Sequence, residues 1–247
     1  MKQIEFFGLP GSGKTYLKNL LKKKYKKKKI EILGYKDILI KYLFYEESNF
    51  LKRNIIKFYL NYKKIKTNKL SNSNNKPVLQ NNKILQNLKN FFFNIYLKNL
   101  DLTFRKYKNK KFIKLTQKLI KNSNFSKNNK NTIERWLKEE VAAKYLIHKN
   151  KIDCVVDSEG FIQRLFVYAY KKNNKEQIIK EYLKSCPLPE YLLITKKKII
   201  KKKLSVNVEF NLDIIEQIKI YNIVLKILKK KIMIYTVDKS NIKKLSV

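Results

Sequence analysis

The first fifteen residues contain the feature that most constrains this chain. They end in Gly8-Leu9-Pro10-Gly11-Ser12-Gly13-Lys14-Thr15, which matches the pattern G-x-x-x-x-G-K-[ST] at every fixed position. Residues 3–7 are predicted to form a short buried strand, and residues 14–27 a helix. The octapeptide therefore has the strand–loop–helix setting in which this pattern binds phosphate groups.

Backbone geometry explains why such a loop attracts anions. Glycines allow successive N–H groups to turn inward around an anion, and the following helix adds its unpaired N-terminal donors and the positive end of its dipole. Lys14 is expected to reach the β- and γ-phosphates of a nucleoside triphosphate, and the Thr15 hydroxyl to ligate Mg²⁺. A glycine-rich turn without a ligand is the alternative, but 5 glycines in 247 residues make a chance match rare. The predicted nucleotide-binding residues are Gly8, Pro10, Gly11, Ser12, Gly13, Lys14, Thr15 and Tyr16.

Length and composition allow one α/β domain with a large insertion, or two small domains. Hydrophobic residues make up 44% of the chain, which is enough for a sizeable core. The octapeptide begins too early for a cleavable signal to precede it, and no apolar run approaches the roughly 18 residues of a membrane span. We therefore expect a cytoplasmic protein. Two cysteines and one histidine are too few for a zinc cluster of Cys and His ligands.

The charge of the chain is extreme, with 58 Lys+Arg against 19 Asp+Glu and a formal net charge of +39. Nucleic-acid or anionic-membrane binding would explain it. A codon bias toward Lys and Asn would also explain the charge, and the even spread of lysines along the chain favours this second explanation. Arginines are rare in this background and their planar guanidinium binds phosphate or carboxylate bidentately, so each is a candidate anion ligand. They are Arg53, Arg105, Arg135 and Arg164.

Two further segments are predicted strands that end beside acids. Residues 30–33 form the second strand and end at Gly34, after which Asp37 is either a general base or substrate anchor, or the N-cap of the next helix. Residues 152–157 form a strand ending in Asp157, which has the form of a Walker B strand whose terminal Asp holds Mg²⁺ directly or through water.

The residues after Asp157 supply the other catalytic candidates. Glu159 is the best candidate for a second acid at the site, acting as a base or through the metal. Arg164 lies in a helix predicted to begin near residue 161 and run to residue 170, where it would face back toward the strand end. The alternatives are an acid that complements the helix dipole and a surface arginine.

Between residues 38 and 149 the strand–helix alternation disappears. Helical spacing predicts helices at residues 38–66, 78–100, 103–121 and 132–149, the last with Thr132 as N-cap. Beyond Asp157 we predict helices at residues 175–184 and 212–229 and strands at residues 191–195 and 231–237. The basic segment 196–203 is either a lid over the triphosphate or a solvated lysine face.

This order of elements, together with the octapeptide, resembles the P-loop kinases of the nucleoside and nucleotide kinase superfamily, which includes thymidylate kinase. The resemblance covers residues 1–40 and 132–247, although Asp157-Ser158-Glu159 stands where thymidylate kinases carry Asp-Arg-Tyr. It implies an α/β P-loop NTPase fold: a five-stranded parallel sheet flanked by helices, with a large helical insertion between strands 2 and 3. Residues 1–37 and 150–247 would form the nucleotide-binding core, and residues 38–149 an acceptor-binding subdomain.

The resemblance also implies ATP and Mg²⁺ as cofactors and transfer of the γ-phosphoryl group to a small-molecule acceptor. Lys14 and Mg²⁺ would neutralise charge, while Glu159 or Asp37 orients the acceptor hydroxyl. Arg53, Arg105 or Arg135 would bind an anionic group of the acceptor. One alternative is a nucleic-acid-associated NTPase or end-kinase that grips phosphates with its basic helices. Another is a module at a membrane surface, with the aromatic residues 91–93 opposite a lysine face.

Overall fold

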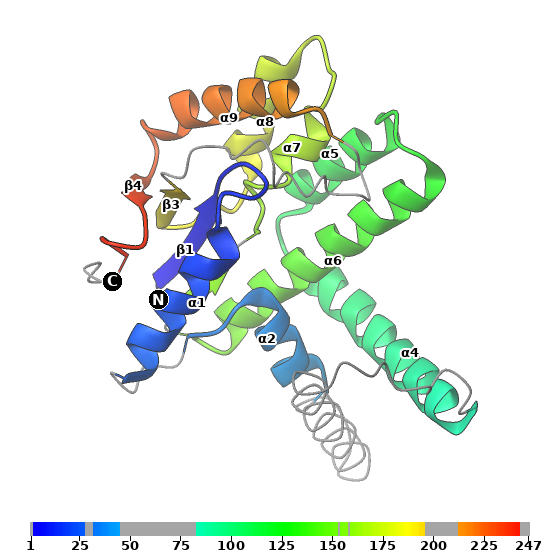
Figure 1. The fold of residues 1–247 in the computed structure, drawn as a ribbon. Coiled ribbons are helices and arrows are strands. Elements are labelled where there is room, and N and C mark those ends of the chain that lie inside the picture. The colour runs from blue at the N-terminus through cyan, green and yellow to red at the C-terminus, as the bar shows by residue number, and fades with distance from the viewer. Residues whose placement is uncertain are drawn as a thin grey trace.

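The computed structural model describes residues 2–27, 32–44, 83–152, 154–157, 159–195 and 212–242. Within these ranges the chain is a mixed α/β structure in which helices flank a parallel sheet (Figure 1). The predicted lid at residues 196–203 and the candidate Arg53 lie outside the described residues, as does most of the helix predicted at residues 38–66.

The sheet contains β1 (Lys2–Phe7), β2 (Cys154–Asp157), β3 (Tyr191–Thr195) and β4 (Met233–Val237), in the order β2-β1-β3-β4. All three neighbouring pairs are parallel. β1 lies inside the sheet between β2 and β3, and five of its six residues are buried. Since all four strands point the same way, their carboxyl ends meet at one edge of the sheet.

The described residues form four strands rather than the five predicted. The segment predicted as the second strand contributes only Leu33, which makes a parallel bridge to Val155 and accepts a 2.9 Å hydrogen bond from the Val156 N–H. The chain leaves the sheet after Leu33 because Gly34 is the N-cap of helix α2 (Tyr35–Leu39). Residues 28–31 lie outside the described part of the chain.

Helix α1 (Lys14–Lys27) covers one face of the sheet, with Leu17, Leu21 and Tyr25 packed in one cluster with Ile4 and Phe6 of β1. The alternation of a strand turns the next side chain, Phe7, to the opposite face.

Phe7 stacks there on Phe166 of α7 (Leu165–Tyr168) and on Tyr221 of α9 (Ile214–Leu228), with ring centroids 5.2 Å apart in both pairs. Helix α8 (Lys175–Ser185) joins the same core. The predicted helix at residues 161–170 is shorter than expected because residues 161–164 form turns.

The helical region consists of α2, a π-helical segment η1 (Ile40–Phe44), α4 (Lys83–Lys106), α5 (Lys110–Lys121) and α6 (Lys127–Lys149). Helix α4 projects away from the sheet in Figure 1. Of the helices in the described ranges, none combines the length and apolarity that crossing a membrane requires.

Two predicted helix boundaries were wrong in this region. Helix α4 continues past residue 100, and the break comes at Asn109, whose side chain caps α5 by accepting from the Phe112 N–H at 3.0 Å. Helix α6 begins at Lys127, with Ser126 as its N-cap rather than Thr132. Thr132 lies inside the helix, where its hydroxyl donates to a backbone carbonyl of the preceding turn.

Candidate functional site

The Gly8–Thr15 loop follows the carboxyl end of β1, at the point where the direction of the strand connections reverses. After β1 the chain passes toward the β2 side of the sheet, and after β3 it passes to β4 on the other side. Ligands of open parallel sheets bind at such switch points. The loop and β3 are in close contact, because a Cβ added to Gly8 would lie 2.8 Å from the Thr195 Oγ1.

The backbone of the loop has the conformation of an anion nest. Gly11 and Gly13 have φ values of 73° and 87°, in the left-handed region that side chains disfavour. The Ser12 hydroxyl is buried and has no hydrogen-bond partner among the described residues. A buried hydroxyl without a partner is costly unless a ligand or water satisfies it, so the loop fits a phosphate group.

Lys14 lies over this loop. Its Nζ donates to the backbone carbonyls of Gly8 at 2.8 Å and Leu9 at 3.1 Å. Burial lowers the pKa of Lys14 to about 8, although the nearby Glu159 carboxylate opposes that shift. The ammonium is therefore held at the loop by neutral acceptors, which a charged phosphate oxygen would replace favourably.

Thr15 and Tyr16 are both exposed in the first turn of α1. Pro10 and Gly11 form the turn that carries the chain back toward the helix, closed by a 3.2 Å bond from the Ser12 N–H to the Leu9 carbonyl. The predicted nucleotide-binding residues thus form one continuous structure at the end of β1.

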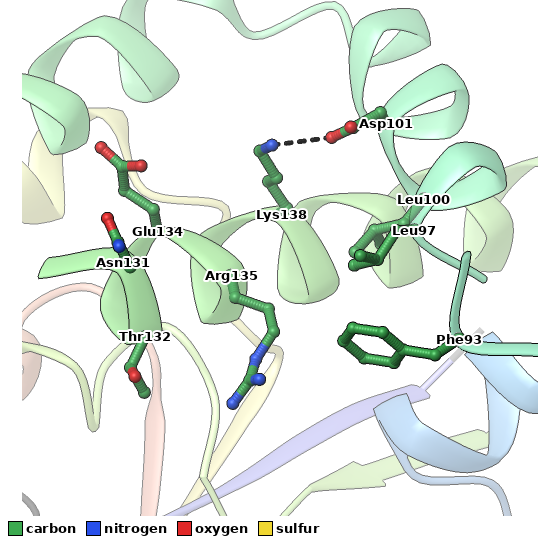
Figure 2. Close-up of a pocket in the computed structure, with 9 residues that line it drawn as sticks. All are labelled: Phe93, Leu97, Leu100, Asp101, Asn131, Thr132, Glu134, Arg135 and Lys138. Carbon is green, nitrogen blue, oxygen red and sulfur yellow. Dashed lines mark hydrogen bonds and ion pairs between the residues drawn. The ribbon is translucent and has the colours of Figure 1, made fainter. Parts of the chain in front are cut away.

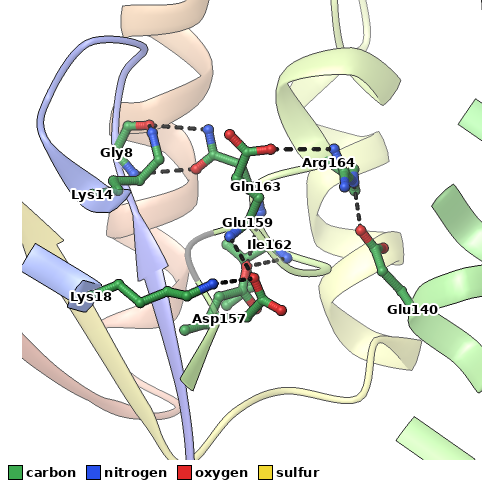
Figure 3. A network of polar contacts seen from close by, with 10 residues as sticks. Gly8, Lys14, Lys18, Glu140, Asp157, Glu159, Ile162, Gln163 and Arg164 are labelled. Carbon is green, nitrogen blue, oxygen red and sulfur yellow. Dashed lines mark hydrogen bonds and ion pairs between the residues drawn. The ribbon is translucent and has the colours of Figure 1, made fainter. Parts of the chain in front are cut away.

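Asp157 ends β2 at the same edge of the sheet as the loop, and in the sheet register it is the partner of Glu5 of β1. Its Oδ2 accepts from the Tyr35 N–H at 2.8 Å, and its Oδ1 accepts from the Glu159 N–H at 3.2 Å. The Lys18 ammonium lies 3.7 Å from Oδ1, as seen in Figure 3. The carboxylate is therefore fixed by three donors from three separate segments.

No group of three or more His, Cys, Asp and Glu side chains gathers as a metal site in the ranges the structure describes. Mg²⁺ in phosphate-transfer sites is held largely by phosphate oxygens and water, with only one or two protein oxygens. The Thr15 hydroxyl and the Asp157 carboxylate are two oxygen donors on the elements that meet at this edge.

Asp37 serves as a helix cap. It is the third residue of α2, and its Oδ2 accepts from the Gly34 N–H at 2.9 Å and from Lys22 Nζ at 2.6 Å. The predicted N-cap position belongs to Gly34. Partial burial raises the pKa of Asp37, but Lys22 and the Gly34 N–H outweigh it and hold that pKa below its ordinary value. Its contacts therefore favour the capping alternative over a general base.

Arg164 is not the surface residue of the alternative interpretation, since its side chain is only 12% exposed. Its Nε donates to Glu140 Oε1 at 2.6 Å, and the guanidinium lies over the Trp136 ring at 4.1 Å from its centroid. Its Nη1 lies 4.0 Å from the Oε2 of Glu159, whose side chain is 57% exposed. The predicted pair, Glu159 and Arg164, is therefore brought together beside Asp157 (Figure 3).

Three residues that sequence reasoning did not assign hold this edge together. Glu5 is buried in β1, and its Oε1 accepts from the N–H groups of Ile162 at 2.9 Å and Gln163 at 3.1 Å. Burial raises the pKa of Glu5 to about 8, while the Gln163 backbone bond opposes the shift. Gln163 and Glu140 are the other two. The position of an acidic residue within a predicted buried strand could have indicated a role for Glu5. The local sequence contained no such indication for Gln163 or Glu140.

A separate cavity of about 360 Å³ lies between α4 and α6 (Figure 2). Phe93, Leu97 and Leu100 of α4 form its apolar wall, and a Lys138–Asp101 ion pair of 2.7 Å crosses its rim. Arg135, predicted to bind an acceptor anion, lines this cavity.

Arg105, the other predicted acceptor ligand within the described ranges, is exposed in the last turn of α4. None of the described contacts joins Arg105 or Arg135 to the Gly8–Thr15 loop.

The chain matches no protein-family model, no curated protein and no solved structure.

Proposed function

We propose that this chain is an ATP- and Mg²⁺-dependent phosphotransferase that moves the γ-phosphoryl group to a small-molecule acceptor such as a sugar, a nucleotide or a related metabolite. The observation that carries the proposal is the loop after β1. The loop contains two left-handed glycines and an unpartnered buried Ser12 hydroxyl, and the Lys14 ammonium bonds to its Gly8 carbonyl at the start of a helix. These features together fit a polyphosphate better than any neutral ligand.

Different groups of the chain would bind the phosphates and the Mg²⁺ ion of ATP. The backbone N–H groups of the loop and the Ser12 hydroxyl would donate to phosphate oxygens. Lys14 would exchange its two carbonyl partners for the β- and γ-phosphates. Thr15 and Asp157 would hold Mg²⁺, directly or through water, and the bound ion would neutralise charge on the phosphates. Residues 1–37 and 150–247 form this nucleotide-binding core in the proposal.

Glu159 and Arg164 would act on the acceptor side. Glu159 is exposed two residues after Asp157, so its carboxylate can orient or deprotonate an acceptor hydroxyl. Arg164 is preorganised by Glu140 and Trp136, so its remaining N–H groups can stabilise charge on the transferred group without reorganisation. The acceptor itself would bind against the helical segment 38–149.

A nucleic-acid-associated NTPase or end-kinase is the second candidate, and the net charge of +39 is the observation that favours it. Its acceptor would be an oligonucleotide end, and binding would weaken steeply as salt rises because counterions are released. Both candidates use the same nucleotide site and differ in the acceptor.

Calorimetric titration of the folded chain with ATP and Mg²⁺ tests the nucleotide site. We expect binding by the wild type, a loss of roughly 100-fold or more in Lys14→Met, and no change in the matched variant Lys23→Met, an exposed lysine of the same helix. Transfer of label from the γ-phosphate of ATP is then screened against metabolite, nucleotide and oligonucleotide pools. Failure of well-folded wild type to take up ATP would remove the proposal.

A further inference from the structure

The side-chain amide of Gln163 makes a pair of hydrogen bonds with the first residue of the loop. Its Oε1 accepts from the Gly8 N–H at 3.3 Å, and its Nε2 donates to the Gly8 carbonyl at 3.1 Å (Figure 3). Because one partner is a donor and the other an acceptor, only a group with both properties can satisfy them together. An amide fits this requirement, whereas a carboxylate or an apolar side chain does not.

The Gly8 carbonyl is shared between two donors. Lys14 Nζ donates to it at 2.8 Å and Gln163 Nε2 at 3.1 Å. If Lys14 turns toward a triphosphate, this carbonyl loses its charged partner and keeps only the amide. Leaving such a carbonyl with no partner would disfavour nucleotide binding, because its desolvation would be uncompensated. The Gln163 amide therefore removes a penalty that would otherwise oppose the movement of Lys14.

Gln163 is itself held firmly to β1. Its backbone N–H and that of Ile162 both donate to Glu5 Oε1. The glycine before this turn lets the segment lie directly on the Glu5 side chain, because a Cβ at Gly160 would come within 2.6 Å of the Glu5 Cδ. The next residue, Arg164, is anchored by Glu140. The backbone of Gln163 is thus anchored, so its side-chain amide stays at Gly8 when Lys14 moves toward the phosphates.

We propose that Gln163 is a positioning residue of the nucleotide site: it fixes Gly8 and remains as the partner of the Gly8 carbonyl when Lys14 moves to the phosphates. This inference rests on the proposed binding of ATP by the loop. It assigns to Gln163 an effect on ATP affinity that operates through Lys14. A side chain that only packed the fold would affect affinity independently of Lys14.

A double-mutant cycle with Lys14 tests the inference, with ATP–Mg²⁺ affinity measured by titration to millimolar nucleotide. Gln163→Met removes both bonds to Gly8, and we expect it to weaken ATP binding roughly tenfold. In a Lys14→Met background the same change should alter affinity by less than about twofold. Gln177→Met is the matched control, because Gln177 is exposed on α8 and bonds only to Glu181 among its described contacts.

Gln163→Glu provides an independent variant of nearly the same size. Its carboxylate can still accept from the Gly8 N–H but cannot donate to the Gly8 carbonyl, so it should weaken ATP binding at least as much as Gln163→Met. It carries the test if Gln163→Met does not fold. Unchanged ATP affinity in a folded Gln163 variant, or equal losses with and without Lys14, would overturn the inference. Absence of ATP binding by the wild type is a different result, which contradicts the proposed function instead.

Discussion

Arg135 belongs to helix α6 and Arg164 bonds to a residue of that helix, but the two guanidinium groups have opposite surroundings. Arg164 is 12% exposed, bonded to a buried Glu140 and stacked on Trp136. Arg135 is exposed at the α4–α6 cavity, where the neighbouring ion pair of Lys138 is also largely solvated. Charges are thus buried and bonded to one another at the strand-end site, whereas water solvates them at the cavity.

This difference separates a preorganised site from an ordinary surface. Exposed ion pairs contribute about 0–1 kcal/mol, whereas losing one member of a buried pair costs about 3–5 kcal/mol. A fold tolerates buried charges at this cost only where their neighbours satisfy them. The strand-end edge meets that condition at Asp157 and Arg164, each held by donors or acceptors from other segments.

The largest expected effect comes from removing the buried arginine. Arg164→Met leaves the Glu140 carboxylate without its charged partner, so the free energy of unfolding should fall by about 3 kcal/mol, measured by denaturant titration. Glu140→Met combined with Arg164→Met should recover most of that loss, because neither charge remains buried. A loss below about 1 kcal/mol in the single variant would place Arg164 in the same class as the surface residues.

The pH dependence of the free energy of unfolding tests how strongly the buried Glu5 differs from a surface carboxylate. Its pKa in the folded chain, about 8, exceeds the ordinary value of 4.5, so its stabilising contribution is complete below pH 4.5 and is lost as pH rises toward 8. Between pH 5 and pH 7 the wild type should lose about 2–3 kcal/mol that Glu5→Gln does not lose.

Thermal or denaturant unfolding of both chains across this window measures the difference. Glu140, whose pKa burial raises to about 7 against the opposing effect of Arg164, titrates in both chains and cancels. Lys14 and Lys144, whose pKa values burial lowers to about 8, change charge mainly above the window. Parallel pH profiles for wild type and Glu5→Gln would contradict the assignment of a neutral, buried Glu5.

Asp37 should have an intermediate effect that separates capping from catalysis. Asp37→Ala removes the bond to the Gly34 N–H and the ion pair with Lys22, and should lower the free energy of unfolding by about 1 kcal/mol. Because its contacts are those of a cap, the rate of phosphotransfer at saturating substrate should stay unchanged. A large fall in that rate with stability preserved would restore Asp37 as a catalytic candidate.

The smallest expected effect is at the cavity. Arg135→Met should change the free energy of unfolding by less than about 0.5 kcal/mol, since its guanidinium is exposed. It should also leave ATP affinity unchanged. If Arg135→Lys raises the KM of an identified acceptor, the cavity takes part in acceptor binding. Arg135 and Arg164 would then both serve the reaction, in different roles.

The sequence predicted the elements whose signals are local. The spacing of glycines around Lys14 located the loop, and apolar runs located β1, β2, β3 and β4 to within about two residues. Helix α1 has the predicted bounds. The placement of Asp157 at the loop's edge of the sheet followed from the parallel arrangement expected of such strands.

The errors arose where the deciding contact is distant or the composition is uniform. The Lys- and Asn-rich stretch around Ser126 offers several possible caps, so the true start of α6 could not be chosen from its residues alone. The partners of Glu5 and Gln163 lie more than 150 residues away along the chain. No local pattern encodes such a pairing, although the acid in β1 showed that one was needed.

The central position of β1 has a consequence for synthesis. Its register partners begin at Cys154 in β2 and at Tyr191 in β3, so both neighbouring strands emerge from the ribosome long after β1 itself. At about 5–20 residues per second this delay is on the order of ten seconds or more. During it, Phe6 and Phe7 have no sheet to enter and are open to chaperones or to aggregation. The Gly8–Thr15 loop is thus made well before the two strands that flank β1, and it reaches its final surroundings only after they are made.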